Sequence, residues 1–349
     1  MGVMNGIRRP RRPLMSGTAV AAVTALGIGA LSACGSSGSG GTAQGGSDKF
    51  DVVASFYPMQ FLAEQIGGEH VNVTSLTQPG QEPHDLELST KQTAELGEAD
   101  AVLYLKSLQP AVDEAVAQSG VKTQVDAATL TELEDHGDVS HDHGHEHEGE
   151  EGHSAEEHAD EHSADEHADE HAEDEHALDP HVWLDPVKYA QIAEGVAQAF
   201  EKADPDNAAD YRKNAEALAG KLDELNTRFE DGLKNTASRT FFTNHAAFGY
   251  LAERYGLTQE AISGVDPDSE PSPARIKELQ EEAKADGVTT VFYETLVSDK
   301  TAKTLAKDAG LRTDVLDPLE GITDRSKGDD YFEVMESNLK ALQTALGAK

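Results

Sequence analysis

Three histidines of this chain stand where an imidazole could bind a metal ion. His84 lies in a loop between Pro83 and Asp85, His181 stands just ahead of a predicted helix, and His245 follows a predicted strand. Neutral imidazole is a good ligand for zinc, copper and nickel. Taken singly, each histidine would more often be a polar residue satisfied within the fold. The metal hypothesis therefore depends on a fold that brings the three rings together.

Most of the remaining histidine lies in one acidic segment. Residues 136–176 hold 11 of the 15 histidines together with 17 acidic residues, and no Lys or Arg. Between Ser140 and Ala177 no apolar side chain is larger than alanine, so the segment cannot bury a core and is expected to be disordered. The alternative, a solvated acidic spacer, has no need of imidazole. We therefore predict weak, multiple metal sites here, at His141, His143, His145, His147, His153, His158, His162, His167, His171 and His176.

The composition excludes several classes of protein. Asp plus Glu outnumber Lys plus Arg by 65 to 28, which gives a formal charge of −37. A nucleic-acid binder needs a basic face, so that class is excluded. A single cysteine in 349 residues excludes a disulfide framework and a cysteine-based zinc finger. The length is sufficient for two lobes, each with a core of its own.

The N-terminus is typical of an export signal. Arg8 and three further arginines up to residue 12 precede an uncharged, Ala- and Gly-rich run from 14 to 30. The run ends in Leu31-Ser-Ala-Cys34, which resembles a bacterial lipobox. This pattern predicts a signal peptide over 1–33, cleavage before Cys34 and lipidation of that cysteine, with an uncleaved membrane anchor as the alternative. The Gly/Ser-rich residues 34–48 would then form a flexible tether.

The elements that must position the three histidines alternate between strand and helix. Strands are predicted at 51–56, 71–76, 101–105, 122–126, 240–243, 259–265, 289–293 and 313–316. Helical patterns lie between them, so each set of four predicts an α/β lobe with a mostly parallel sheet flanked by helices. His84 and His245 follow strands of different lobes. Because ligands bind beyond the carboxyl ends of strands in such sheets, a metal held by both would lie in the cleft between the lobes.

A long helix is predicted between the two sets. Apolar residues recur at spacings of three and four from Tyr211 to Leu233, which makes one stripe on a helix of roughly 28 residues, about 40 Å long. We expect this rigid helix to pack on both lobes and to permit only small hinge motion, with coiled-coil pairing as the alternative. The predicted domains are an N-terminal lobe over 49–204 with an insertion at 136–177, the helix over 205–235, and a C-terminal lobe over 236–349.

Four motifs, in this order, resemble one known family. They are Pro83-His84-Asp85, Asp179-Pro-His-Val-Trp-Leu-Asp-Pro186, Asn244-His-Ala-Ala-Phe-Gly-Tyr250, and Ile262-Ser-Gly followed by Glu270-Pro-Ser-Pro273. These motifs resemble the metal-binding lipoproteins of bacterial ABC importers, and most closely the zinc-binding, ZnuA-like branch. The resemblance covers about residues 50–347, and the His-rich insertion falls where that branch carries one. It implies two α/β lobes joined by a long helix, with one metal buried between them.

The resemblance also implies a set of metal ligands. His84, His181 and His245 match the family's three imidazole positions, and Glu294 matches the carboxylate of zinc members. Three imidazoles and one carboxylate form a tetrahedral, nitrogen-rich site, which independently suits zinc. The implied transported ligand is therefore Zn²⁺.

The fourth ligand and the metal have alternatives within the same family. Manganese members place an aspartate a few residues after the Glu294 position, where this chain has Ser298 and then Asp299. A bound water could also complete the site. Manganese prefers more oxygen ligands, and the manganese branch would have a carboxylate where His245 stands. His245 is therefore the residue that most decides the metal.

The function implied by the resemblance is capture of Zn²⁺ outside the cytoplasm. The protein would be a monomer, anchored to the cell membrane as a lipoprotein, and would deliver the metal to an ABC permease driven by a cytoplasmic ATPase. Uptake of manganese, nickel or copper by the same class of importer is one alternative, and a surface adhesin or scaffold with structural zinc is another. An enzyme is not expected, because the sequence lacks His-Glu-x-x-His, Gly-x-Ser-x-Gly and a Gly-rich phosphate loop.

Overall fold

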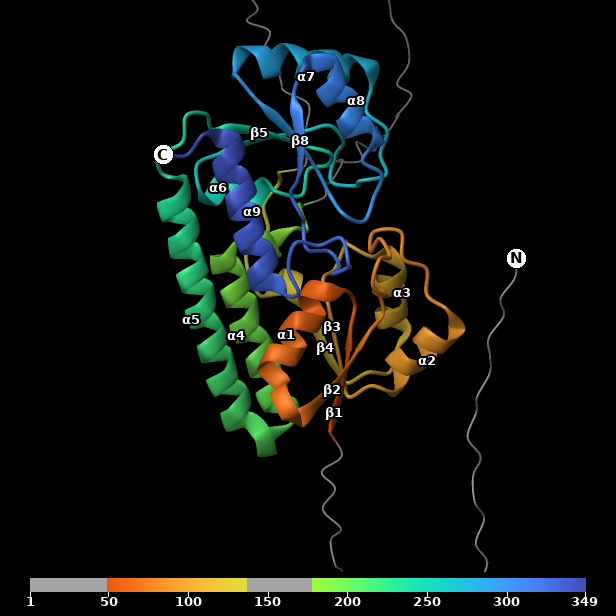
Figure 1. Ribbon diagram of the computed structural model, residues 1–349. Helices are drawn as coiled ribbons and strands as arrows, with labels where there is room; N and C mark the ends of the chain where they lie inside the picture. Colours follow the sequence, from red (N-terminus) through yellow and green to blue (C-terminus); the bar gives the residue numbers. More distant parts are fainter. Residues whose placement is uncertain (1–48, 137–177) are drawn as a thin grey trace, which may run out of the picture. The chain divides into compact units, whose positions relative to one another are not determined.

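Figure 1 shows a computed structural model of the protein, which describes residues 49–136 and 178–349. The predicted signal peptide, the predicted tether with Cys34, and the ten predicted histidine ligands between 141 and 176 lie outside these residues. Among the helices that are described, none combines the length and the apolar character needed to cross a membrane.

The N-terminal lobe is built on a four-stranded parallel sheet with the order β2-β1-β3-β4. Its strands are β1 (Phe50–Ala54), β2 (Val71–Ser75), β3 (Ala101–Tyr104) and β4 (Thr123–Asp126), and the helices between them are α1 (Tyr57–Gly67), α2 (Thr90–Glu98) and α3 (Pro110–Gln118). In β1, Val52 pairs with Val73 of β2 on one side and with Ala101 of β3 on the other. β1 and β3 are mostly buried, apolar runs, whereas β2 alternates between buried and more exposed residues, and both patterns predict strands from sequence.

The C-terminal lobe repeats this topology with the strand order β6-β5-β7-β8. Its strands are β5 (Thr240–Thr243), β6 (Thr258–Ala261), β7 (Thr290–Tyr293) and β8 (Arg312–Val315), and its helices are α6 (Gly249–Arg254), α7 (Pro273–Ala285), α8 (Lys300–Ala309) and α9 (Tyr331–Leu346). Ser272 caps α7 by accepting a hydrogen bond from the Arg275 amide at 3.1 Å. The predicted fold of two parallel-sheet α/β lobes is confirmed.

The predicted long helix is α5 (Ala208–Leu233), which packs along α4 (Pro186–Ala203). The seven apolar residues of its stripe are all buried. Near one end, Asn214 donates a hydrogen bond to the carbonyl of Ile66 in the N-terminal lobe at 3.0 Å. Near the other end, the Gly232 carbonyl accepts one from Gln343 of α9 at 3.3 Å. The helix therefore packs on both lobes, as predicted.

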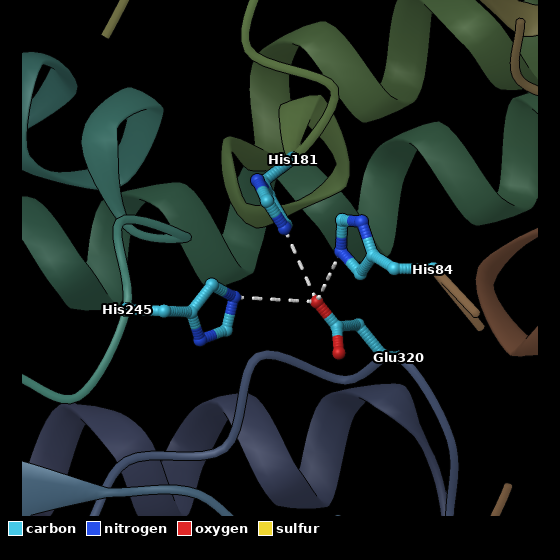
Figure 2. A group of neighbouring side chains, drawn as sticks. All are labelled: His84, His181, His245 and Glu320. Atoms are coloured by element: carbon cyan, nitrogen blue, oxygen red, sulfur yellow. Dashed lines mark hydrogen bonds and ion pairs between the residues drawn. The ribbon is translucent and has the colours of Figure 1, made fainter. Parts of the chain in front are cut away.

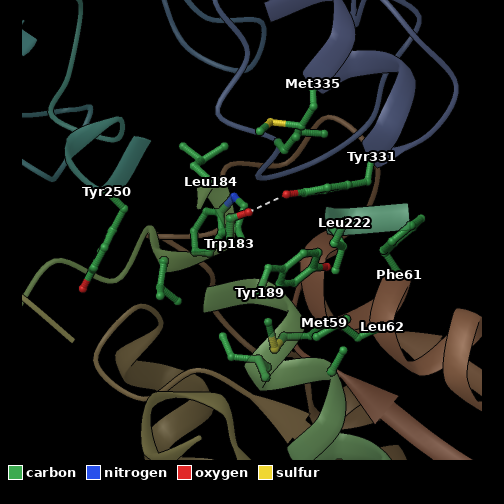
Figure 3. Packing of buried hydrophobic residues seen from close by; sticks show 14 of the residues in the cluster. Met59, Phe61, Leu62, Trp183, Leu184, Tyr189, Leu222, Tyr250, Tyr331 and Met335 are labelled. Atoms are coloured by element: carbon green, nitrogen blue, oxygen red, sulfur yellow. Dashed lines mark hydrogen bonds between the residues drawn. The ribbon is translucent and has the colours of Figure 1, made fainter. Parts of the chain in front are cut away.

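One hydrophobic core runs from the N-terminal lobe through α4 and α5 to α9. Figure 3 shows its centre, where the side chains of Trp183, Tyr189 and Tyr331 are fully buried. The Tyr331 hydroxyl donates to the Trp183 carbonyl at 2.7 Å, and the Trp183 indole N–H donates to the Pro318 carbonyl at 2.7 Å. The segment that contains Trp183 is thereby fixed to the C-terminal lobe.

Replacing Tyr331 with phenylalanine should lower the free energy of unfolding by about 1 kcal/mol, because a buried carbonyl loses its donor while the ring stays packed. Urea unfolding followed by circular dichroism measures this as a lower midpoint at an unchanged slope. Tyr104→Phe is the matched control, since no hydrogen bond of the Tyr104 hydroxyl is found among the described residues. Equal losses in the two variants would contradict the assignment.

Candidate metal centre

Four side chains converge in a buried group: His84, His181, His245 and Glu320 (Figure 2). Each offers one ligand atom, and these atoms all lie within 4.8 Å of one another. Oε1 of Glu320 is 3.1 Å from Nε2 of His181, 3.4 Å from Nε2 of His84 and 3.5 Å from Nε2 of His245. Three imidazole nitrogens thus face one carboxylate oxygen. A metal ion placed among these four atoms would be bound by all of them.

Both lobes contribute to this group. His84 lies in the loop after β2, and His181 immediately precedes a short 3-10 turn at Val182–Leu184 that leads into α4. In the C-terminal lobe, His245 follows β5 and Glu320 lies in the loop after β8. Parallel strands place their carboxyl ends at one edge of a sheet, so the loops that follow them meet there. The predicted cleft position of the site follows from this topology.

Carboxylates behind two of the rings fix the ring orientations. Nδ1 of His181 lies 2.8 Å from Oδ1 of Asp179, and Nδ1 of His245 lies 2.7 Å from Oε1 of Glu294. The side-chain amide of Asn244 donates to the same Glu294 oxygen. A carboxylate at Nδ1 keeps the proton on that nitrogen and leaves Nε2 free to bind a metal. Asp179 and Glu294 therefore set the tautomers that a metal site requires.

The centre is almost closed to solvent. The side chains of His181, His245 and Glu320 are at most 1% exposed, and that of His84 is 12% exposed. A ligand ring that reaches the surface gives a metal ion a point of first contact. We therefore expect His84 to lie on the entry side of the site.

The metal-free centre holds protons where a metal would bind. Burial lowers the pKa of His245, but the charges of Glu294 and Glu320 outweigh it and hold that pKa well above 6.5. Burial likewise lowers the pKa of His181, and its two carboxylate partners raise it to a net increase. Burial opposes the ionisation of Glu320, yet the three imidazoles that face its carboxylate hold its pKa well below 4.5. A metal must therefore displace imidazole protons to bind.

A further carboxyl group, Glu82, lies beside the centre. Burial, and then the charge of Glu320, raise the pKa of Glu82 to about 9. Its Oε1 accepts a hydrogen bond from the amide of His84 at 2.8 Å. In the metal-free protein, burial and Glu320 therefore favour the uncharged form of Glu82, which supports the His84 loop.

The residues present fit a divalent metal. Within the described parts of the chain, Nε2 of His245 and Oε2 of Glu320 are buried without a hydrogen-bond partner. Such atoms cost roughly 1–3 kcal/mol each when they remain unpaired. A metal bound among the four groups would satisfy both. The set of three imidazoles and one carboxylate is the kind of tetrahedral set that zinc takes.

The structure brings together three of the four residues that the resemblance implied. His84, His181 and His245 are all members of the group, whereas Glu294 is not. Glu294 contacts Nδ1 of His245, on the side of the ring that faces away from the group, and Glu320 supplies the carboxylate instead. Asp299, next to the manganese-type position at Ser298, is paired with Lys303 at the start of α8.

Glu320 belongs to none of the motifs that indicated the site. The available signal was its position after a strand, the same rule that selected His84 and His245. The loop that contains Glu320 is held by Asn338 of α9. The Asp317 backbone amide donates to the Asn338 side-chain oxygen at 2.9 Å, and the Asn338 side-chain amide donates to the Asp317 carbonyl at 2.7 Å. The preceding Leu319 adopts φ +60°, a conformation that non-glycine residues hold only where their surroundings enforce it.

Of the histidines that the structure describes, two lie outside this group. Nε2 of His70 is 3.0 Å from Oδ2 of Asp210, at the N-terminal end of α5. His136, which begins the segment expected to be disordered, is a described residue whose ring packs edge-on against Tyr250 with centroids 4.4 Å apart. The expectation of disorder is wrong for His136, because Tyr250 and Asp179 both contact its ring.

Comparison with known proteins finds one matching family and relatives that are named as zinc-binding or zinc-uptake proteins. The model of the family ZnuA, zinc-uptake complex component A periplasmic, matches residues 52–345. The zinc-binding lipoprotein AdcA of Streptococcus pneumoniae is 36% identical over 301 residues, which cover 84% of this chain and 55% of AdcA, so the chain spans about half the length of that relative. The high-affinity zinc uptake system protein ZnuA of Bacillus subtilis is 36% identical over 325 residues, which cover 91% of this chain and 94% of that protein.

A solved structure extends the likeness to the fold. The crystal structure of the Zn(II)-bound ZnuA-like domain of Streptococcus pneumoniae AdcA matches with a TM-score of 0.65 and 33% identity, covering 85% of this chain and 99% of that chain. The family match, the two-lobed fold and the histidine–carboxylate centre agree with one another. The chain belongs to the ZnuA family of zinc-uptake components.

Proposed function

We propose that this protein captures Zn²⁺ outside the cytoplasm and delivers it to the permease of an ABC importer whose cytoplasmic ATPase drives uptake. The observation that carries the proposal is the buried group of three imidazoles and one carboxylate contributed by both lobes. The names of the relatives, which are zinc-binding and zinc-uptake proteins, support it.

The proposed ligands are Nε2 of His84, His181 and His245 and a carboxylate oxygen of Glu320. Zinc binds imidazole nitrogen at about 2.0–2.1 Å, so the rings would close slightly on the metal from their present positions. Nitrogen-rich, four-coordinate sites favour zinc, whereas manganese favours more oxygen ligands. The carboxylates of Asp179 and Glu294, behind two of the rings, offset part of the added positive charge.

The division of the ligands between the lobes suits capture and release. His84 and His181 come from the N-terminal lobe, and His245 and Glu320 come from the C-terminal lobe. A bound metal would therefore tie the two lobes together, and a small separation of the lobes would remove two of the four ligands. Because α5 packs on both lobes, we expect the release motion to be small and to need the permease.

The same geometry argues against an enzyme. Catalytic zinc sites keep a coordination position for water, commonly with three protein ligands. Here four protein groups converge on one point, and three of them are at most 1% exposed. A saturated, closed site leaves the metal no open coordination position for catalysis.

The proposal predicts how many zinc ions bind. In a full-length variant in which the ten histidines from His141 to His176 are replaced with asparagine, one tight zinc should remain and most of the weak binding should disappear. Competition with a chromophoric chelator measures the tight site, and equilibrium dialysis counts the weak ones. Loss of the tight zinc in this variant would place the capture site in the His-rich segment instead.

The proposed attachment of the protein to the membrane depends on lipidation of Cys34. Cys34→Ala should block lipid attachment and either release the protein from the membrane or leave its precursor unprocessed. Membrane fractionation and gel mobility measure this, with Ser36→Ala in the predicted tether as the matched control. Unchanged attachment and mobility in Cys34→Ala would argue for an uncleaved anchor.

A further inference from the structure

A second group of potential metal ligands lies outside the interlobe centre. Glu134, His136 and Glu253 each offer one ligand atom, and these atoms lie within 4.8 Å of one another. Nε2 of His136 is 2.8 Å from Oε2 of Glu253 and 3.8 Å from Oε2 of Glu134. One imidazole nitrogen thus faces two carboxylates, which together form part of a divalent-cation site.

The His136 ring is held in the orientation that such a site needs. Nδ1 of His136 lies 3.2 Å from Oδ2 of Asp179, and the ring packs edge-on against Tyr250. Gly249 makes room for it, because a Cβ there would lie 2.3 Å from the Cβ of His136. A carboxylate at Nδ1 is the usual outer partner of a metal-binding histidine. The contacts with Asp179, Tyr250 and Gly249 therefore keep Nε2 of His136 directed toward the two glutamates.

Asp179 serves both groups. Its Oδ1 lies 2.8 Å from Nδ1 of His181 in the interlobe centre, and its Oδ2 lies 3.2 Å from Nδ1 of His136. The side chain is fully buried. One carboxylate thus orients a histidine of each group in the same way, which makes the outer group a structural counterpart of the inner one.

The glutamates of the outer group are also positioned. The amide of Glu134 donates to the Tyr250 hydroxyl at 2.7 Å, and its Oε1 lies 2.5 Å from Nζ of Lys188. That contact leaves Oε2 turned toward His136. Glu253 lies on α6, one turn beyond Gly249. The carboxylates of Glu134, Glu253 and Asp179 all lie around the His136 ring, with Lys188 paired to one of them, and three carboxylates at one place attract a divalent cation.

The outer group lies at the base of the His- and acid-rich insertion. His136 directly precedes residues 137–177, and Asp179 follows them closely. The Asp179 amide donates to the Glu134 carbonyl at 2.9 Å, so the chain is pinned on both sides of the insertion. A metal ion held by the insertion would meet this group where the insertion joins the lobe.

We propose that Glu134, His136 and Glu253 form a second divalent-cation site that accepts Zn²⁺. It binds more weakly than the interlobe centre, because it has three protein ligands and the side chains of Glu134 and Glu253 are 34% and 60% exposed. Water completes the coordination on the open side. Asp179 links the two sites through the histidine that it holds in each. The second site does not depend on the proposed transport function.

The test uses the full-length variant in which the ten histidines from His141 to His176 are asparagine. Isothermal titration with Zn²⁺ should show two binding events of one equivalent each, a tight one and a weaker one. Adding His136→Asn should abolish the weaker event and keep the tight one. Adding Glu253→Gln, a change at an exposed side chain, should weaken the second event without affecting folding.

The matched control is His70→Asn, because His70 also pairs with a carboxylate, Asp210 at 3.0 Å, but no second carboxylate joins it in a described cluster. This variant should keep both events. Nitrogen-15 spectra of the histidine rings add a direct readout, since Nε2 of His136 should shift with the second equivalent. One event only in the parent variant, or a second event that survives His136→Asn, overturns the proposal. Loss of the tight event alone would count against the proposed function and leave this site standing.

Discussion

Zinc affinity should fall by more than about 100-fold when His181 or His245 is replaced with alanine, because a ligand is lost, whereas losing an outer partner costs roughly 10–100-fold. Both rings are buried, so water cannot readily take the vacated position. Competition titrations with a chelator of known zinc affinity, in the variant without the ten histidines from His141 to His176, measure the loss. His70→Ala is the control, and it should leave the tight site intact.

The carboxylates give the sharper version of this test. Glu320→Ala should cost more zinc affinity than Glu294→Gln, because Glu320 faces three Nε2 atoms, whereas the one ring that Glu294 contacts is that of His245, at Nδ1. Glu294→Gln keeps a hydrogen-bond acceptor behind the ring and should stay within about 10–100-fold of the parent. The reverse order would make Glu294 the ligand, as the family resemblance implied.

His245→Glu should narrow the preference for zinc over manganese by adding a hard oxygen donor.

Zinc affinity should also fall steeply as the pH drops through the pKa values of the ligand imidazoles, since each imidazole proton that zinc must displace contributes about a tenfold change per pH unit below its pKa. The pKa values of His181 and His245 are raised in the metal-free protein, so both rings hold protons at higher pH than free imidazole. Zinc binding removes these protons, and acid therefore opposes binding. The carboxylate of Glu320 has a lowered pKa and stays ionised through this range.

The pH dependence is measured by chelator competition from pH 8 to pH 5, and the proton release is measured by calorimetry in buffers of different ionisation enthalpy. His245→Ala supplies the internal control, because the slope against pH should become shallower when one titrating ligand is gone. An affinity that stays flat between pH 7.5 and pH 5 would rule out an imidazole site.

The local pattern of the sequence determined most of the secondary structure. The strand at Thr240–Thr243 has the predicted bounds, because a short run of strand-forming residues is a local signal. The apolar stripe from Tyr211 to Leu233 likewise predicts α5, because the spacing of apolar residues along a helix is a short-range signal. The three histidines were selected by their place after strands or before a helix, and by the motifs around them.

The tertiary structure decided the fourth member of the site. Glu320 has no local signature, and its position depends on contacts with distant parts of the chain: the Trp183 indole holds the Pro318 carbonyl, and Asn338 holds Asp317. Glu294, which a motif comparison favours, instead orients His245 from behind. Sequence spacing tells which residues follow a strand, whereas the direction in which a loop carboxylate points is set by packing between the lobes.

The same reason explains His136. By composition it belongs to a segment without a core, yet Tyr250, Asp179 and the space above Gly249 fix its ring. These partners lie in both lobes, and only the closed fold brings them to one place. Composition predicts which part of the chain lacks a core, and long-range packing decides that His136 is held in the fold.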